Sequence, residues 1–341
     1  TVYIGKEMWS KSHGSQFWQY YVNSFMWVRD VRAVGSNQAR IFLRNKITEW
    51  LKLRDYQNES RWSSEVLSKR IFYLLTNLSF FFETANEEFQ IKFAENINKQ
   101  CIILLNRAKK TQSFVDDIFL VKAIILSTLC FKNLSKNYQL SIRFLTNIIE
   151  KKVLEDGMHN LRSPSEHFFF LCSLVDIRNF LGSLKKEIPK ELNKKIKEMT
   201  NVLKFFIIGD GHLAIFNKYD YVSIKKIENV FKKVSYTNKL PKLSECSGFV
   251  RISKKKFTFV MDCGKPTKEK THAGSLSFEF SHFSEKIVVN SGSPFIRNQT
   301  WNDAMRSTAA HSTLNINEIN SSDIFFEKDN TTRIANVQFK K

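Results

Sequence analysis

The sequence predicts an α+β multidomain fold, with a helical domain first and an antiparallel β domain second. Apolar residues recur at helical spacing from about residue 15 to about residue 208. The breaks between these stretches are short and polar, which favours antiparallel neighbouring helices. After about Val234 the pattern changes to short segments of period two, interrupted by Gly, Asn and Ser. We therefore predict a helical domain over 1–235, a polar linker and a β domain over 245–341.

Seven stretches of the first domain have helix length and an apolar stripe. Ser163 and Pro164 form a good start for one of them, because Pro fits the first turn and Glu166 lies near the positive end of the helix dipole. About seven or eight such helices suit an (α/α) solenoid or an incomplete toroid of helical hairpins. The predicted helices are 40–53, 65–82, 87–109, 114–131, 137–153, 164–184 and 189–208.

Six segments of the second domain alternate between apolar and polar residues, as antiparallel strands do. The chain begins at Thr1 without Met and stops just after the last of these segments, so we expect a fragment whose β domain is incomplete at its C-terminal end. No signal peptide is visible. The predicted strands are 248–253, 256–263, 275–281, 286–291, 312–316 and 333–340.

Composition limits the class of protein. Hydrophobic residues make up 43% of the 341 residues and include 31 Phe, so a folded core is expected. The longest apolar stretch, 118–131, is too short for a membrane span and contains Lys122. The five Cys are far apart and odd in number, without a CxxC pair, which indicates neither a disulfide framework nor a zinc knuckle.

The net charge suggests a polyanionic partner. Lys and Arg total 53 against 33 Asp and Glu, which gives +20. Such an excess favours an acidic polysaccharide, an anionic lipid or a nucleic acid. The alternative is a composition bias, because Asn, Ile and Phe are abundant as well. A nucleic-acid-binding helical repeat would rest on charge alone, without a supporting motif, so no nucleic acid is expected.

Two His residues lie in Gly-containing turns of the helical region. His159 is in a loop just before a helix, where catalytic groups are common, although by itself the position favours a surface His in a turn. His212 is followed by Tyr219 and Tyr221, and a His beside a Tyr can form an acid–base pair. A tight turn with incidental polar residues is the alternative for this segment.

Two further His residues stand at the beginnings of predicted strands. Strand-end residues such as His272 and His311 can converge on one metal ion or one substrate, and zinc would require three or four ligands. Asn290 is the candidate for a third zinc ligand beside these two His residues, although a neutral Asn is a weak ligand. The alternative is that both imidazoles bond to the backbone inside the sheet.

Aromatic residues lie beside Arg near the N-terminus. Trp27 and Arg29 have the chemistry that a sugar acid needs, because aromatic faces stack on sugar rings and guanidinium groups bind carboxylates. An amphipathic helix with a core Trp is the competing interpretation.

Several segments, in order along the chain, resemble the heparinase II/III family of polysaccharide lyases. That family has an N-terminal (α/α) toroid and a C-terminal antiparallel β-sandwich, in agreement with the division predicted above. The resembling segments are WVRD at 27–30, DGMH at 156–159 with RSP at 162–164, DGHLAIFN at 210–217, HAGSLSFE at 272–279, VNSG at 289–292 and RSTAAHST at 306–313.

The resemblance implies cleavage of a uronic-acid-containing polysaccharide by β-elimination. A base removes the C5 proton of the uronate, a cation or donor neutralises the carboxylate, and an acid protonates the departing oxygen at C4. His159 matches the family's helical-domain residue that meets the carboxylate or takes the proton. The candidates for the acid are His212, Tyr219 and Tyr221, which are the nearest to the family's Tyr position.

The resemblance also assigns residues of the β domain. His272 is a candidate catalytic residue, because it matches one of the two His of a family motif. The other His of that motif is Lys here, at residue 270, and its Asp is Gly274. A zinc site at His272, Asn290 and His311 is implied, with Asn in the place of the usual Asp. Arg162 and Arg306 join Trp27 and Arg29 as candidates for substrate binding.

These implications lead to two functional hypotheses. The first is a carbon–oxygen lyase that acts on an acidic, glycosaminoglycan-like polysaccharide. The second is a catalytically impaired glycan-binding or envelope polysaccharide-assembly protein on the same scaffold. The family's substrates imply a bacterial protein of the periplasm or cell envelope.

Overall fold

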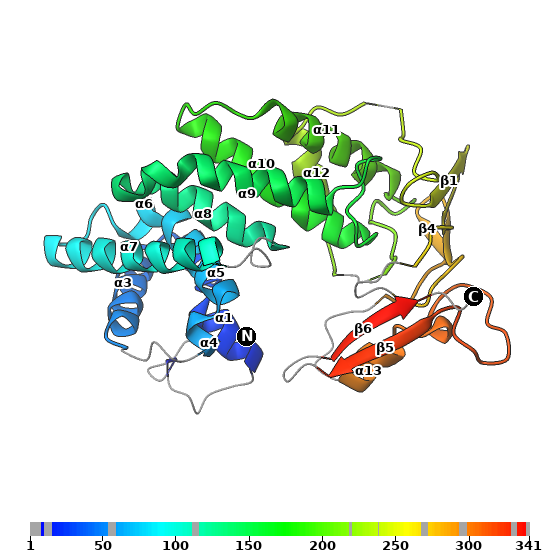
Figure 1. Cartoon of the computed structure of the whole chain (residues 1–341), viewed down its shortest axis with the longest axis horizontal. Helices are drawn as coiled ribbons and strands as arrows, with labels where there is room; N and C mark the ends of the chain where they lie inside the picture. The colour runs from blue at the N-terminus through cyan, green and yellow to red at the C-terminus, as the bar shows by residue number, and fades with distance from the viewer. Residues whose placement is uncertain are drawn as a thin grey trace. The chain divides into compact units, whose positions relative to one another are not determined.

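The computed structural model describes residues 8–9, 16–53, 59–110, 116–217, 220–237, 239–266, 272–292, 299–328 and 333–338 (Figure 1). It divides into two compact units, Thr1–Ile148 and Ile149–Lys341. The last long helix ends at Lys233 and the first strand begins at Phe249. The division into compact units falls earlier than the change from helices to strands, so the domain boundaries 1–235 and 245–341 stay a prediction.

The first unit is built of helices around an aromatic core. Trp27, which the sequence offered as a sugar-binding residue, is 1% exposed and lies in this core, where its ring stacks on Phe25 at 5.4 Å. Its indole N–H donates to the Val22 carbonyl, 3.1 Å away. The helices are α1 (Gln16–Asn23), α2 (Val28–Val34), α3 (Asn37–Leu51), α4 (Glu59–Trp62), α5 (Ser64–Thr76), α6 (Leu78–Phe81), α7 (Glu87–Lys110), α8 (Ile118–Cys130) and the 3₁₀ turn η2 (Lys132–Asn137).

The helix predicted over 65–82 is two helices, α5 and α6, separated at Asn77. The side-chain amide of Asn77 donates to the Tyr73 carbonyl and its oxygen accepts from Arg32, at 2.7 and 3.2 Å. Asn competes in this way with helical backbone hydrogen bonds, and this competition explains the break. The apolar spacing continues through the break, so the sequence pattern did not show it.

The second unit contains α10 (Pro164–Ser183), α11 (Lys190–Phe205) and α12 (Ile224–Lys233), while α9 (Tyr138–Lys152) passes from the first unit into the second. The predicted start of α10 is confirmed, because the Ser163 hydroxyl accepts from the Glu166 N–H and Pro164 occupies the first turn. Helix α12 was not among the predicted helices. Its buried residues Ile227 and Val230 have the helical i, i+3 spacing that could have revealed it.

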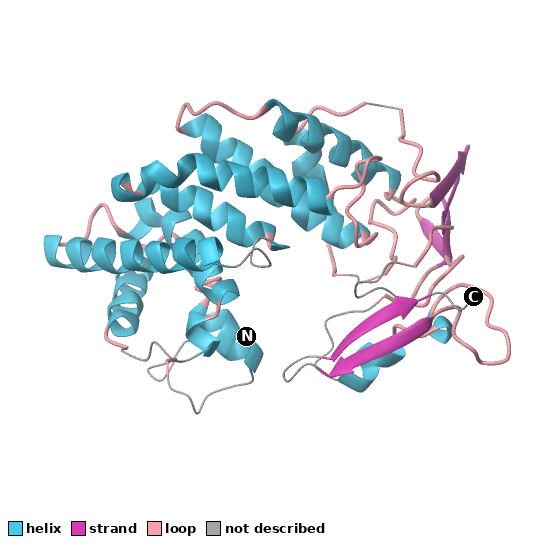
Figure 2. Ribbon diagram, in the orientation of Figure 1, coloured by secondary structure: helices cyan, strands magenta, loops and turns pink. Residues whose placement is uncertain are grey.

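Four antiparallel strands form the main sheet in the order β1 (Phe249–Lys254), β2 (Phe257–Asp262), β3 (Phe278–His282) and β4 (Glu285–Val288). A second pair is β5 (Asp323–Lys328) with β6 (Arg333–Gln338), and a short helix α13 covers Gln299–Ala304 (Figure 2). The strand predicted over 312–316 is wrong. This segment bends, because the Ser312 N–H donates to the Asn290 side chain and the Thr313 N–H donates to the His311 carbonyl.

The alternating pattern of β3 places its polar side chains in the interior. Ser277 just before the strand, Glu279 and Ser281 are 3%, 1% and 1% exposed, whereas Phe278 and Phe280 are half-buried. The Gly209 N–H donates to the Ser281 hydroxyl over 3.0 Å, so this face contacts the backbone of a loop rather than an apolar surface. A Cβ at Gly209 would lie 1.7 Å from the Phe283 carbonyl oxygen, which requires glycine there.

The sheet and the end of α11 are joined by a side chain. One guanidinium nitrogen of Arg251, in β1, donates to the carbonyls of Phe205 and Ile207 over 2.6 and 2.7 Å. These carbonyls lie at a helix C-terminus, where α-helical partners are lacking and a cation is favourable. Burial lowers the pKa of Arg251 to about 10. Within the described residues, no helix is both long and apolar enough to cross a membrane.

Candidate functional site

Arg162 lies at the centre of the contacts between the loop after α9 and the sheet. Its side chain is buried, and its guanidinium forms an ion pair with Asp262 and donates to the carbonyls of Ser247 and Lys265 at 2.7 and 2.9 Å. Burial raises the pKa of Asp262 even though the Arg162 guanidinium acts in the opposite direction. This guanidinium is engaged by protein groups, and its assignment to a substrate carboxylate stays a prediction.

Asn217 connects this loop to the β domain's His. Its amide donates to the Arg162 carbonyl over 3.0 Å, and its oxygen accepts from the His272 N–H over 3.4 Å. Asn217 has a positive φ of 55°, a conformation that Asn tolerates better than most residues. One buried amide thus ties two of the sequence motifs together.

His159 is buried beside a second His. Its Nδ1 accepts from the Leu161 N–H at 3.2 Å, and its own backbone N–H donates to Nδ1 of His167 at 3.3 Å. Nε2 of His167 lies 2.8 Å from the Met199 carbonyl and donates to it. Burial, with a contribution from His167, lowers the pKa of His159 to about 3, and burial lowers that of His167 to about 4. Both imidazoles are therefore neutral at pH 7.

His272 and His311 face each other, as the sequence predicts for residues that converge. Nδ1 of His272 is 3.3 Å from Nε2 of His311. This separation suits one shared proton, and it also suits two nitrogens on one zinc ion with Zn–N bonds of about 2.0 Å. Burial lowers the pKa of His272 well below its usual value and that of His311 to about 4.

The third residue of the implied zinc site is engaged elsewhere. The Asn290 oxygen accepts from the N–H and the hydroxyl of Ser312, at 3.1 and 3.0 Å, and its amide donates to the Ile215 carbonyl at 2.9 Å. Among the described residues, no group of three or more His, Cys, Asp or Glu side chains could hold a metal ion. Zinc requires three or four ligands, and within the described residues the two imidazoles have no third one, so the zinc site stays a prediction.

Glu279 is a buried acid that sequence reasoning missed. One carboxyl oxygen accepts from the Asn290 N–H at 3.0 Å, while the other has no hydrogen-bond partner among the described residues. Burial raises the pKa of Glu279 to about 7. The signal in the sequence is a Glu between two Phe of a strand, whose position on the interior face could not be decided from alternation alone.

His212 belongs to a charged cluster at the turn before Ala214. Its Nδ1 is 3.0 Å from Oδ2 of Asp210, and the same oxygen is 2.9 Å from Nζ of Lys286 in β4. The His212 and Tyr221 rings are 5.8 Å apart between centroids. Asp210 orients the His212 ring through Nδ1, and Nε2 makes no hydrogen bond to any described residue. The structure thus brings together His212 and Tyr221, and adds Asp210 and Lys286, which the sequence did not indicate.

The remaining candidates differ in their surroundings. Arg306 is partly buried and close enough to His272 to lower its pKa. Arg29 lies in the first unit, where it is exposed and 3.5 Å from the Asp30 carboxylate. Tyr219 and Lys270 lie outside the described residues.

Comparison with known proteins identifies the scaffold. Residues 237–341 match the family described as "Heparinase II/III-like, C-terminal". The chain resembles heparinase III with a TM-score of 0.73 and 15% identity, over 96% of this chain and 60% of that one. It resembles the heparan sulfate lyase HepC from Pedobacter heparinus with a TM-score of 0.66 and 17% identity, over 96% and 59% of the two chains.

A curated relative is FtsZ-localized protein C from Caulobacter vibrioides, 24% identical over 245 residues. The match covers 72% of this chain and 42% of the relative, so this chain spans less than half of that protein's length. The ordered motifs, the helices followed by antiparallel strands and the structural matches agree. Residues 237–341 are therefore similar to the heparinase II/III-like C-terminal domain, and the chain has a fold like that of heparinase III.

Proposed function

We propose that the protein binds an acidic polysaccharide on its heparinase-like scaffold without cleaving it. The observation that carries this proposal is the engagement of Arg162 by Asp262, Ser247 and Lys265. An eliminating enzyme needs a cation or a strong donor at the uronate carboxylate, since the enolate-like charge develops there. In this chain the buried guanidinium of Arg162 pairs with protein groups and stabilises the fold instead.

The acid–base requirements of elimination support the same conclusion. A general base works best when its pKa lies near the working pH. The pKa of His159 is about 3, so its imidazole is a weak base and carries no positive charge at neutral pH. Lys stands at residue 270 and Gly at 274, where the family has His and Asp.

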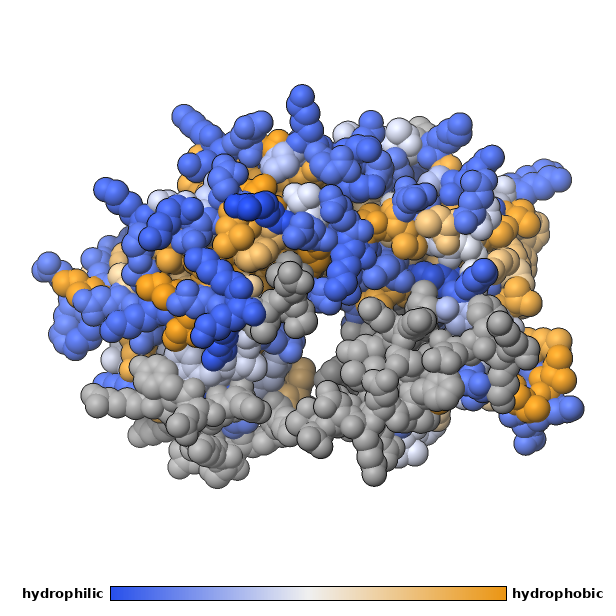
Figure 3. Space-filling model, in the orientation of Figure 1, coloured by the Kyte–Doolittle hydropathy of each residue, from blue (hydrophilic) through white to orange (hydrophobic). Residues whose placement is uncertain are grey.

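Binding of a polyanion is favoured by the charge of the chain. The net charge of +20 attracts polyuronates over long range. Figure 3 shows hydrophilic side chains over most of the described helical surface on this face. The relative from Caulobacter has a name that denotes a location and not a reaction, which fits a role other than catalysis.

We expect glycan binding to survive the loss of both motif His residues. The double variant His159→Ala, His272→Ala should bind a fluorescently labelled uronate oligomer within about twofold of the wild-type affinity. The reason is that both imidazoles are buried and make internal hydrogen bonds. Fluorescence anisotropy at fixed ionic strength measures the affinity, and circular dichroism verifies that the variant is folded.

The single variant Lys190→Ala, on the exposed start of α11, is the control for surface charge. A folded double variant that loses more than about tenfold in affinity would contradict the proposal, because the His residues would then be part of the binding site.

A lyase is the second candidate, and one observation favours it. The Asp210–His212 pair beside Tyr221 has a carboxylate that orients an imidazole, with a phenol next to it. Such a group can pass a proton to a departing sugar oxygen. If elimination occurs, His212→Asn and Tyr221→Phe should each abolish it, while His159→Asn should change it less.

A further inference from the structure

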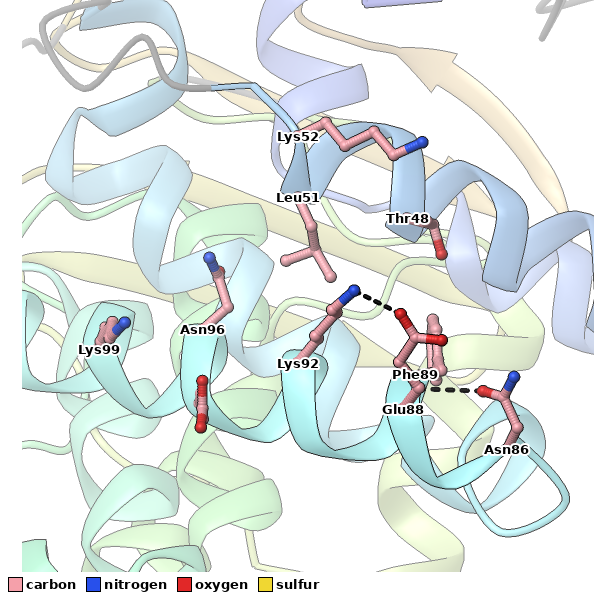
Figure 4. A pocket seen from close by; sticks show the side chains of 10 residues that line it. Thr48, Leu51, Lys52, Asn86, Glu88, Phe89, Lys92, Asn96 and Lys99 are labelled. Carbon is pink, nitrogen blue, oxygen red and sulfur yellow. Dashed lines mark hydrogen bonds and ion pairs between the residues drawn. The ribbon is translucent and has the colours of Figure 1, made fainter.

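A pocket of about 500 Å³ lies in the first unit, between α3 and α7. Its size falls within the range of roughly 300–1,000 Å³ for small-molecule sites. Figure 4 shows Thr48 and Leu51 reaching from α3, and Lys92 reaching from α7, into the space between the two helices. The pocket belongs to none of the motifs described above.

The lining of this pocket combines three kinds of group. Leu51 and Phe89 provide an apolar surface, and Phe89 stacks on Phe93 at 6.0 Å, which holds its ring in place. Thr48, Asn86 and Asn96 contribute a hydroxyl and two amides. The charged residues are Lys52, Lys92, Lys99, Glu88 and Glu95.

The charges of the pocket are only partly paired. Nζ of Lys92 lies 2.5 Å from the Glu88 carboxylate, and this contact lowers the pKa of Glu88. Within the described part of the chain, the ammonium groups of Lys52 and Lys99 have no ion-pair partner. Two cations are therefore available to a ligand that carries a carboxylate or sulfate.

The mixed lining favours a sugar over an acidic peptide. Carboxylates such as Glu95 accept hydrogen bonds from sugar hydroxyls, which the side chains of an acidic peptide lack. Amides pair with hydroxyls as both donor and acceptor. An aromatic ring offers its face to the C–H groups of a sugar ring.

We propose that the pocket between α3 and α7 is a glycan site, which holds one or two residues of an acidic sugar chain through Lys52, Lys99 and Phe89. This proposal rests on the proposed function only for the class of ligand, an acidic sugar chain. If the 149–341 unit also binds the polymer, a site on the helical unit adds a second point of attachment, and the combined affinity exceeds that of either site alone.

The test uses the full 341-residue chain. An oligogalacturonate of defined length is titrated calorimetrically, and hydrogen exchange maps the protected segments. We expect protection over 86–99 and an affinity loss of about tenfold for the double variant Lys52→Glu, Lys99→Glu, because each charge-assisted contact contributes strongly to binding. The matched control is Lys132→Glu, Lys136→Glu, which makes the same charge change at exposed positions of η2.

Three results would contradict the proposal that this pocket binds a glycan. One is a pocket variant that binds as tightly as the η2 control. The second is a poly-glutamate peptide of equal charge that binds as well as the sugar. The third is protection confined to 149–341, which would leave the proposed function standing. A wild-type chain that binds no uronate oligomer would overturn both proposals. If binding persists in the His159, His272 double variant and falls only in the pocket variant, the pocket is supported separately.

Discussion

Replacing Arg162 with Met is expected to lower the free energy of unfolding of the 149–341 unit by about 3–5 kcal/mol. The substitution leaves the Asp262 carboxylate buried without its cation, and it removes the donors to the Ser247 and Lys265 carbonyls. The cost of an uncompensated buried charge is the dominant part of this loss. Urea denaturation followed by circular dichroism measures it.

A double-mutant cycle separates the ion pair from the other contacts. Asp262→Asn should also destabilise the protein, and the double variant should lose less than the sum of the two single variants, because its partners no longer carry an unpaired charge. Arg178→Met is the control, since its guanidinium makes one exposed hydrogen bond to the Lys233 carbonyl and should contribute about 1 kcal/mol or less. If the losses of unfolding free energy in the two single variants simply add up in the double variant, the ion pair between Arg162 and Asp262 does not stabilise the protein.

Acidification to pH 5 is expected to destabilise the protein through His159 and His167. Their pKa values in the folded protein are about 3 and about 4, below the value of about 6.5 in an unfolded chain. Above pH 6.5 both states are neutral and the two His residues contribute no pH dependence. As the pH falls below 6.5, only the unfolded state binds protons, so stability falls until the folded pKa is reached. At pH 5 each of the two imidazoles lowers the free energy of unfolding by about 2 kcal/mol.

Variant differences isolate this effect from the other titrating groups of the unit. His159→Asn keeps an acceptor for the Leu161 N–H and removes the titrating ring. The stability lost between pH 7 and pH 5 should therefore be about 2 kcal/mol smaller in this variant than in the wild type. Burial raises the pKa of Glu279, so this residue makes the protein more stable as the pH falls from 7 to 5. Its contribution is the same in the variant and the wild type, and it cancels from the difference between them. Equal pH dependence in the two proteins would mean that His159 is solvated and free to protonate.

The order of elements and the position of α10 could be predicted because they depend on local signals. Ser163 and Pro164 fix a helix start wherever they occur before an apolar run. The heparinase-like scaffold followed from motifs in order. The split at Asn77 and the bend at Ser312 depend on side-chain hydrogen bonds to Arg32 and Asn290 respectively. These partners are 45 and 22 residues away in the chain, and no local pattern encodes them.

The candidate site was less predictable than the fold for the same reason. His272 and His311 meet as expected. Asp262, which pairs with Arg162, lies 100 residues later in the chain. The sequence around an Arg is the same whether its side chain is free or paired, so this ion pair could not be predicted. Trp27 similarly belongs to the core, which only packing reveals.

We propose that the motif side chains stabilise the structure and do not catalyse elimination. The most direct measurement records absorbance of the new C4–C5 double bond while glycan binding is followed in the same sample, over a panel of uronate polymers. The account predicts binding to at least one polymer with no rise in absorbance. A rise that disappears in His212→Asn or Tyr221→Phe would contradict it and establish the lyase.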